Sequence, residues 1–156
     1  MTATIELREV VKASVGEVCR LAVAPSQTHL VAPNAVSIAQ AYFEPAAWFR
    51  AVYANDTAVG FAMLYDPTRT DAPEDGPDVC WLWRFMIDAR FQRQGHGAGA
   101  LALLVEHVST LRVARFALSY VPEPGNASAL YSRAGFVPTG EMEDGEAVME
   151  LLLAGR

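Results

Sequence analysis

The stretch at residues 90–99, Arg-Phe-Gln-Arg-Gln-Gly-His-Gly-Ala-Gly, constrains the fold most strongly, because it joins a predicted strand to a predicted helix. The apolar run at 79–87 is typical of a buried β-strand, and residues 97–111 repeat apolar side chains at helical spacing. The glycines let backbone N–H groups approach an anion, and a helix starting there adds the positive end of its dipole. Arg93 adds a positive charge. These features predict a phosphate-binding turn.

A dinucleotide site is one interpretation of this turn, since Gly95-x-Gly97-x-x-Ala100 matches the glycine pattern. That pattern requires its first glycine directly after the strand and an acidic residue at the end of the next strand. Here residues 88–94 intervene, and the next predicted strand, 116–120, is followed by no acid of that kind. The sequence therefore disfavours a dinucleotide and leaves another phosphate-bearing ligand.

The hydropathy pattern predicts one α/β domain over residues 1–156, since the chain is too short for two typical domains. Ser14 caps the first predicted helix, with Val15, Val18, Cys19 and Ala22 facing inward, and an Asn34/Ser37 region caps the second. The predicted strands are 4–10, 48–53, 59–65, 79–87, 116–120 and the two arms of a hairpin at 136–153. The predicted helices are 14–24, 37–43, 97–111 and 126–134. The acidic, proline-containing segment 66–78 is predicted to be an exposed loop.

Two motifs resemble those of the GNAT acetyltransferases. Gln92-x-x-Gly95-x-Gly97 is similar to the family's acyl-CoA pyrophosphate loop. About thirty residues later, Ala127-x-x-Leu130-Tyr131-x-x-x-Gly135-Phe136 is similar to its helix and following strand. The predicted order β-α-α-β-β-β-α-β-α-β-β also resembles the GNAT fold, which implies a mixed, mostly antiparallel sheet with splayed central strands.

The resemblance implies acetyl-CoA as the cofactor and no metal. It implies that Tyr131 protonates the departing thiolate and that the strand backbone pairs with pantetheine like an added strand. The residues expected to bind the cofactor are Phe85, Met86, Ile87, Gln92, Arg93, Gln94, Gly95, His96, Gly97, Ala98, Gly99, Asn126 and Tyr131. Asn126 stands five residues before Tyr131, whereas many members place an asparagine seven before, so a helix cap is its alternative role.

Residues 81–88 and 31–42 resemble a bacterial GNAT branch named spermine/spermidine acetyltransferases, which implies a small cationic amine acceptor, with a polyamine favoured. An ammonium must lose a proton before it attacks the thioester directly in a ternary complex. Trp83 stands where mammalian enzymes of this fold carry a glutamate. The substitutes for that base are Glu44 and His29, then Asp78 or an acid within 141–144.

Arg84 is the charged exception in the apolar strand, so we expect a carboxylate partner or an anionic group of the acceptor beside it. Aromatic residues could line the acceptor site or pack in the core; they are Trp81, Trp83, Tyr42, Phe43 and Trp48. Cys19 and Cys80 have no metal-ligand spacing with the histidines, and we expect buried thiols.

The formal net charge of −6 argues against nucleic acid as a partner and is compatible with a cationic substrate. No apolar run approaches the roughly 20 residues that span a bilayer, and the N-terminus does not resemble a secretory signal, so we expect no membrane partner and a cytoplasmic location. The fold commonly pairs, which makes a homodimer the expectation. Besides small-amine acetylation, three functions stay open: a catalytically degenerate CoA-binding module, and acetylation of protein amines or of antibiotics.

Overall fold

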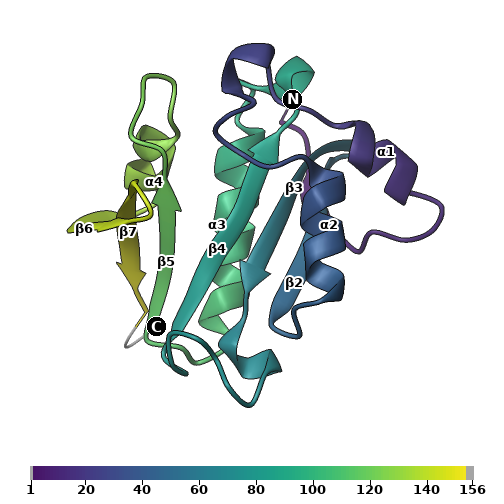
Figure 1. Ribbon diagram of the computed structural model, residues 1–156. Coiled ribbons are helices and arrows are strands. Elements are labelled where there is room, and N and C mark those ends of the chain that lie inside the picture. Colours follow the sequence, from purple (N-terminus) through teal and green to yellow (C-terminus); the bar gives the residue numbers. More distant parts are fainter. Residues whose placement is uncertain (1, 154–156) are drawn as a thin grey trace.

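One seven-stranded sheet organises the chain, with helices on both faces (Figure 1). The computed structural model describes residues 2–153. The strands are β1 (Ile5–Arg8), β2 (Ala47–Ala54), β3 (Thr57–Tyr65), β4 (Val79–Ile87), β5 (Arg115–Tyr120), β6 (Val137–Glu143) and β7 (Glu146–Leu152). The helices are α1 (Val15–Arg20), α2 (Asn34–Tyr42), α3 (His96–Ser109) and α4 (Ser128–Arg133), with 3-10 turns at Pro25–Gln27, Pro67–Arg69 and Ala89–Phe91.

The spatial strand order is β1-β2-β3-β4-β5-β7-β6. Neighbouring strands are antiparallel except β4 and β5, which are parallel. The predicted element order and the mixed, mostly antiparallel sheet are therefore confirmed. Within the described residues, no helix combines the length and the apolar character needed to cross a membrane.

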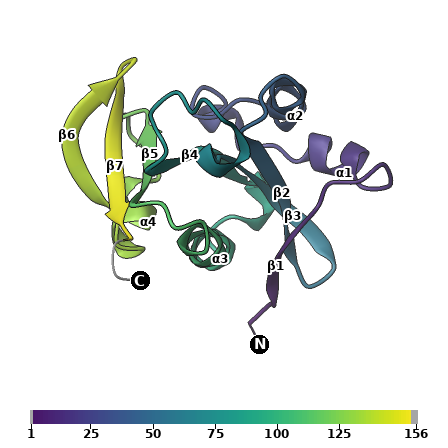
Figure 2. The ribbon, with the colours of Figure 1, turned by 90° about the horizontal axis from the view of Figure 1, so that it is seen from below.

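The core forms two layers because strand side chains alternate between the faces of the sheet. From β3, Ala62 and Leu64 join one apolar cluster with α3 and α4, while Phe61 and Met63 join another with α1. Figure 2 shows α3 and α4 on one side of the sheet and α1 and α2 on the other. The apolar side of α3 packs on the sheet, and its residues without exposed surface are Ala100, Leu101, Leu104 and Val108.

Two local predictions near the N-terminus are wrong. The α1 helix ends at Arg20, so Ala22 lies outside it and is exposed, while Leu21 is buried instead. Asn34 and Ser37 do not form a cap region, because α2 already begins at Asn34. Both side chains are buried, and the Asn34 amide donates to the Val18 carbonyl oxygen at 3.0 Å. Asn34 therefore ties α2 to α1.

The central strands separate halfway along their length. The β4–β5 ladder pairs only Val79 to Leu82 with Arg115 to Leu118, although β4 continues to Ile87. On the other edge of β4, Met63 pairs with Arg84 and Leu64 with Leu82, which leaves Trp83 as the extra residue of a β-bulge. A bulge bends its strand and increases the local twist. β4 consequently diverges from β5 immediately after Leu82 (Figure 1).

Beneath the paired half of the sheet, the imidazole of His107 in α3 stacks on Trp48, with 4.1 Å between ring centroids. Arg50 lies over the same tryptophan ring at 4.4 Å. The buried Nε2 atom of His107 has no hydrogen-bond partner among the described residues. Burial lowers the pKa of His107, and the nearby Arg50 lowers it further, while Asp66 acts in the opposite direction.

We expect His107→Phe to weaken the dependence of folding stability on pH. The unfolded chain protonates this histidine near its ordinary value of 6.5. The stability that depends on neutral His107 is therefore complete above that pH and is lost as the pH falls through the lowered pKa of the folded state. Phenylalanine keeps the aromatic stack but cannot titrate. Denaturant unfolding of both proteins at several pH values measures the difference; identical pH slopes would contradict this account.

Candidate active site

A cleft of about 1250 Å³ lies along the part of β4 that has no partner in β5. Residues 81–87 of β4 form its floor, and Ser119 and Tyr120 of β5 lie across the gap. The segment 27–33 and the loop after β5 contribute the walls, and the start of α3 lies at one end. The separation of two parallel strands thus creates this cleft.

The phosphate-binding turn predicted from the glycines opens into this cleft. Gly95 has a φ of 85° and precedes the first residue of α3, and no side chain caps the helix. Arg93 also has a positive φ, 62°, which a non-glycine residue rarely adopts. The cleft is lined here by Arg93, Gly95, Gly97 and Ala98. An uncapped N-terminus of a 14-residue helix, with N–H groups free and an arginine beside it, fits a pyrophosphate.

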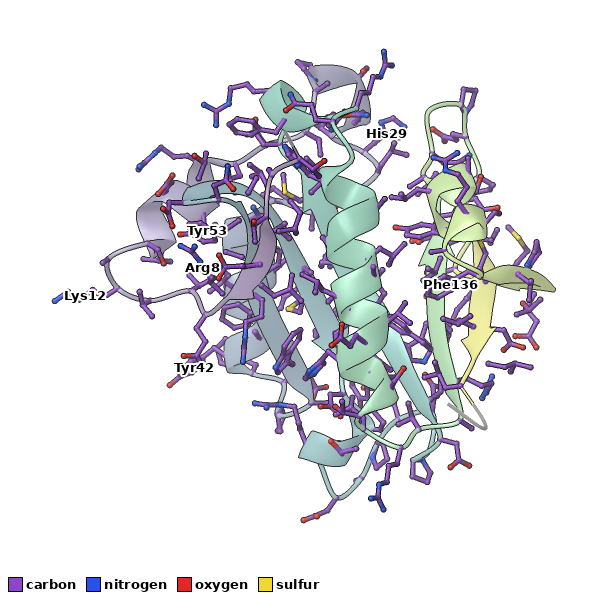
Figure 3. The ribbon with its side chains drawn as sticks, turned by 180° about the vertical axis from the view of Figure 1, so that it is seen from behind. Arg8, Lys12, His29, Tyr42, Tyr53 and Phe136 are labelled. Carbon is purple, nitrogen blue, oxygen red and sulfur yellow. The ribbon has the colours of Figure 1, made fainter. Side chains whose placement is uncertain are left out.

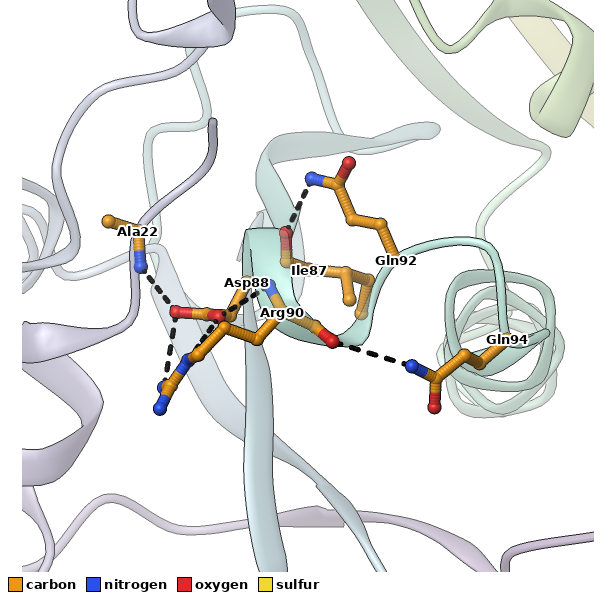
Figure 4. A network of polar contacts seen from close by, with 6 residues as sticks. All are labelled: Ala22, Ile87, Asp88, Arg90, Gln92 and Gln94. Atoms are coloured by element: carbon orange, nitrogen blue, oxygen red, sulfur yellow. Dashed lines mark hydrogen bonds and ion pairs between the residues drawn. The ribbon is translucent and has the colours of Figure 1, made fainter. Parts of the chain in front are cut away.

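The glutamines of the turn hold its shape. Gln92 donates to the Ile87 carbonyl oxygen at 2.9 Å (Figure 4). It also donates to the side-chain oxygen of Gln27 at 3.0 Å. Gln94 donates to the Arg90 carbonyl oxygen at 3.4 Å. The Gln92 side chain lines the cleft but is fully engaged with the protein, so its observed contacts are those of a brace between the turn and β4.

Asp88, at the end of β4, anchors the same region (Figure 4). Its buried carboxylate accepts from the Ala22 N–H at 2.9 Å and from both the backbone and the side chain of Arg90. Burial opposes the charge, but the hydrogen bonds from Arg90 and Ala22 hold the pKa of Asp88 below its usual value. No local pattern predicted that Asp88 connects β4 to the segment after α1.

Three residues of the predicted cofactor set, Gln94, His96 and Gly99, do not line the cleft. His96 is only 9% exposed and is not among the residues that line it. A Cβ atom at Gly99 would lie 3.0 Å from the side chain of Ile5 in β1. Gly99 therefore allows α3 to pack closely on the sheet, which is a structural reason for glycine at that position.

The end of β4 offers unpaired backbone groups to the cleft. The Asp88 N–H bonds to the Val59 carbonyl oxygen of β3, so strand alternation turns the N–H groups of Phe85 and Ile87 toward the gap. The N–H of Met86 points instead toward β3, where Met86 pairs with Phe61. The Met86 side chain is buried in the apolar cluster that includes α1. Phe85 and Ile87 thus carry the edge to which an extended ligand could add, as the resemblance implied.

Tyr131 of α4 reaches the cleft from the other wall and is 7% exposed. Its ring lies edge-on to Phe136, with 6.1 Å between centroids. Burial raises the pKa of Tyr131 to about 12, so the side chain is a neutral phenol at physiological pH. A buried phenol at a cleft wall can donate its O–H to an anion that develops there.

Asn126 also borders the cleft, but both ends of its side chain are occupied. Its amide donates to the Glu123 carbonyl oxygen at 2.7 Å, and its oxygen accepts from the Ser128 N–H at 2.8 Å. The second bond satisfies a free N–H at the start of α4. The observed contacts of Asn126 are therefore those of a helix cap.

The two expected bases, Glu44 and His29, both line the cleft but lie in different parts of it. Glu44 follows α2, and its carboxylate accepts from the Ala46 N–H at 3.0 Å. The His29 ring nitrogen lies 2.7 Å from the carboxylate of Glu123, and both side chains are about half exposed. Figure 3 shows His29 at the edge of the loops that flank the cleft. The contact between His29 and Glu123 therefore joins the segment 27–33 to the loop after β5.

The prediction of a carboxylate partner for Arg84 is wrong, because no described carboxylate lies within ion-pair distance of it. Its guanidinium donates to the Gln40 side chain at 3.1 Å and to the Trp83 carbonyl oxygen at 3.0 Å. Burial lowers the pKa of Arg84, and the more distant Glu146 partly offsets this. The bulge at Trp83 turns Arg84 toward α2, where the Gln40 amide binds one end of the guanidinium, while the buried Nε atom has no hydrogen-bond partner among the described residues.

Carboxylates from three separate segments gather along the cleft. They are Glu44 after α2, Glu74 and Asp75 in the loop before β4, and Glu143, Asp144 and Glu146 at the β6–β7 turn. The Tyr65 hydroxyl accepts from the Glu74 N–H at 3.0 Å and fixes the loop. Burial and the nearby Asp75, Asp144, Glu141 and Glu146 raise the pKa of Glu143. Sequence reasoning missed Glu74, Asp75 and Glu146, because segment 66–78 was interpreted only as an exposed loop.

Cys19 and Cys80 are free thiols, and Cys80 is buried, whereas Cys19 is only partly buried. Across residues 2–153, no three or more histidine, cysteine, aspartate or glutamate side chains form a group that could hold a metal ion. Of the aromatic candidates, Trp81 and Trp83 line the cleft, whereas Tyr42 and Phe43 are exposed on α2 and Trp48 stacks on His107.

The strand separation, the glycine turn and the tyrosine opposite them define an acyltransferase that uses a pyrophosphate-bearing donor. Residues 27–136 match the model of the acetyltransferase (GNAT) family. The chain is also 36% identical, over 110 residues, to a spermine/spermidine N(1)-acetyltransferase of Bacillus subtilis, a match that covers 69% of each protein. The chain belongs to the GNAT family and is an N-acetyltransferase with acetyl-CoA as its donor.

Solved structures share the fold at low sequence identity. The aminoglycoside acetyltransferase AAC(6')-Ib in complex with coenzyme A superposes with a TM-score of 0.76 at 18% identity, covering 96% of this chain and 95% of that one. The ribosomal-protein-S18-alanine N-acetyltransferase of Escherichia coli gives 0.69 at 17% identity, covering 98% and 96%. These likenesses confirm the predicted fold class.

We expect Gly97→Val to weaken coenzyme A binding at least about tenfold, which is about 1.4 kcal/mol. A Cβ atom at Gly97 would already contact Leu130 at 3.4 Å and Ile87 at 3.7 Å, so a branched side chain must extend into the cleft. Calorimetric titration with coenzyme A measures the loss. Gly16→Ala is the control, because Gly16 lies in α1 outside the cleft and an added Cβ atom would meet only the Arg20 side chain, at 3.4 Å. Unchanged affinity in Gly97→Val would remove the glycine turn from the binding site.

Proposed function

We propose that this N-acetyltransferase acetylates a primary amine of a polyamine by direct attack in a ternary complex. The observation that carries the proposal is the convergence of six carboxylate residues on one cleft, described above. Clustered carboxylates favour an acceptor with several positive charges over a neutral amine. The similarity to a curated spermine/spermidine acetyltransferase supports the same acceptor class.

The donor end of the cleft is suited to coenzyme A. The free N–H groups at the start of α3, with Arg93, would hold the pyrophosphate, and the edge of β4 at Phe85 and Ile87 would pair with the pantetheine amides. When bound, acetyl-CoA supplies the acetyl group as an activated thioester. An N–H of this edge would also polarise the thioester carbonyl.

Tyr131 is proposed as the general acid. Its phenol is neutral at physiological pH, because burial raises its pKa to about 12. A proton held this firmly is available throughout the working pH range, and the O–H stabilises the leaving sulfur by hydrogen bonding as negative charge develops on it. The edge-on contact with Phe136 holds the ring at the cleft wall.

The acceptor would be held by its charges and by its methylene chain. Trp81 and Trp83 line the same cleft as the carboxylates, and their rings offer apolar surface for the alkyl segments of the acceptor. A primary ammonium with a pKa near 10.4 must first lose a proton, which costs about 4.6 kcal/mol at pH 7. The carboxylates thus attract the acceptor, and at least one group must also receive its proton.

A thiol-release assay with acetyl-CoA tests the acceptor class. We expect spermidine and spermine to be acetylated with kcat/KM at least about tenfold above that of a simple alkyl monoamine, because only polyamines engage several carboxylates. Aminoglycosides, amino acids and peptides complete the panel. Preference for an aminoglycoside or a peptide would replace the proposed acceptor, and coenzyme A binding without turnover on any amine would favour a binding module.

We expect Tyr131→Phe to lower kcat by about a hundredfold while coenzyme A affinity stays within about twofold, because only a proton donor is removed. Steady-state kinetics and titration with coenzyme A measure the two quantities. Tyr53→Phe is the matched control, since Tyr53 is a buried tyrosine of β2 outside the cleft. A Tyr131→Phe protein with unchanged kcat would exclude the hydroxyl from catalysis.

A further inference from the structure

If the proposed function holds, one group of this cleft must receive the proton of the attacking amine. That group has to lie where β4 and β5 separate, because the edge of β4 and Tyr131 direct the acyl group to that gap. The two bases expected from the sequence are engaged elsewhere, since Glu44 bonds to the Ala46 N–H and His29 pairs with Glu123.

Glu146 lies at the required place. It is the first residue of β7, and its neighbour Ala147 pairs with Tyr120, the last residue of β5. The Ser119 hydroxyl donates to the Glu146 carboxylate at 3.1 Å. Both Ser119 and Glu146 line the cleft. The end of β5 that faces the open half of β4 therefore carries a carboxylate held in a defined orientation by a neighbouring hydroxyl.

The remaining acids of the β6–β7 turn are less suited to the task. Glu143 and Asp144 are exposed at the turn, whereas Glu146 is partly buried. Two charged groups face Glu146. Arg84 of β4 lies across the cleft and Glu143 lies on the same hairpin, and the charge of Glu146 raises the pKa of both. Asp75 and Asp144 act on Glu143 from the adjoining segments.

We propose that Glu146, oriented by Ser119, is the general base of the acetyl transfer. Glu146 first takes one proton from the ammonium and passes it to solvent, which leaves a neutral amine. As the nitrogen–carbon bond forms and the carbon–sulfur bond breaks, the nitrogen gives its second proton to the Glu146 carboxylate, and the sulfur leaves with the proton of the Tyr131 hydroxyl, which Tyr131 regains from solvent. The protonated carboxyl then returns its proton to solvent through the open cleft. Ser119 acts as a positioning residue, because its hydroxyl fixes the carboxylate that contacts the amine.

The test compares Glu146→Gln with Glu150→Gln on the same strand. Glu150 is ion-paired with Arg115 at 3.3 Å and does not line the cleft. We expect Glu146→Gln to lower kcat by about a hundredfold or more with a monoamine as well as with spermidine, and to remove the acidic limb of the kcat–pH profile. We expect Glu150→Gln to keep both kcat and the profile of the wild type.

Ser119→Ala gives a second readout. We expect a fall in kcat smaller than that of Glu146→Gln, with a displaced acidic limb and unchanged coenzyme A affinity, because the base stays but loses its hydrogen bond. A Glu146→Gln protein with wild-type kcat and only a raised KM for polyamines would overturn the proposal, since Glu146 would then merely attract charge. If the wild-type enzyme acetylated none of the amines, the proposed function itself would be refuted, so the two failures are distinguishable.

Discussion

The end of the β4–β5 ladder after Leu82 and Leu118 is the constraint on which the rest of the site depends. Two parallel strands that stayed paired would leave no free backbone edge and no room between them. The bulge at Trp83 bends β4 at that point, and Asp88 and Gln92 then fix the far end of the strand by hydrogen bonds. The cleft is therefore built by rigid elements, and its donor side is made largely of backbone groups.

The two functions of the cleft use different chemistry. At the donor end, N–H groups at the start of α3 and along β4 provide positive partial charge for a phosphate-bearing ligand. At the acceptor end, carboxylates from three segments provide negative charge, and the pKa of Glu143 is raised by burial and by these neighbours. The negative charge around Glu143 is compatible with the positively charged acceptor that we propose.

Local signals in the sequence were sufficient to predict β4 and the glycine turn that opens into the cleft. The bounds of β4 were predicted at 79–87 and are Val79–Ile87, because an apolar run interrupted only by Arg84 marks a central strand. The glycine turn and Tyr131 were predicted from motifs whose spacing is local. The carboxylate side of the cleft was not predictable in this way, since Glu74 and Glu146 reach the same cleft only through the tertiary arrangement of segments that are distant in sequence. The prediction of a carboxylate partner for Arg84 failed for a similar reason, because its partner Gln40 lies on another element, forty-four residues away.

Amide hydrogen exchange, resolved by residue, tests most directly whether the open edge of β4 binds the donor. Added coenzyme A should protect the N–H groups of Phe85 and Ile87 and those at the start of α3, while the amides of β1 and β2, far from the cleft, keep their exchange rates. If the amides at 85, 87 and 95–98 exchange equally fast with and without saturating coenzyme A, the strand separation is not the donor site.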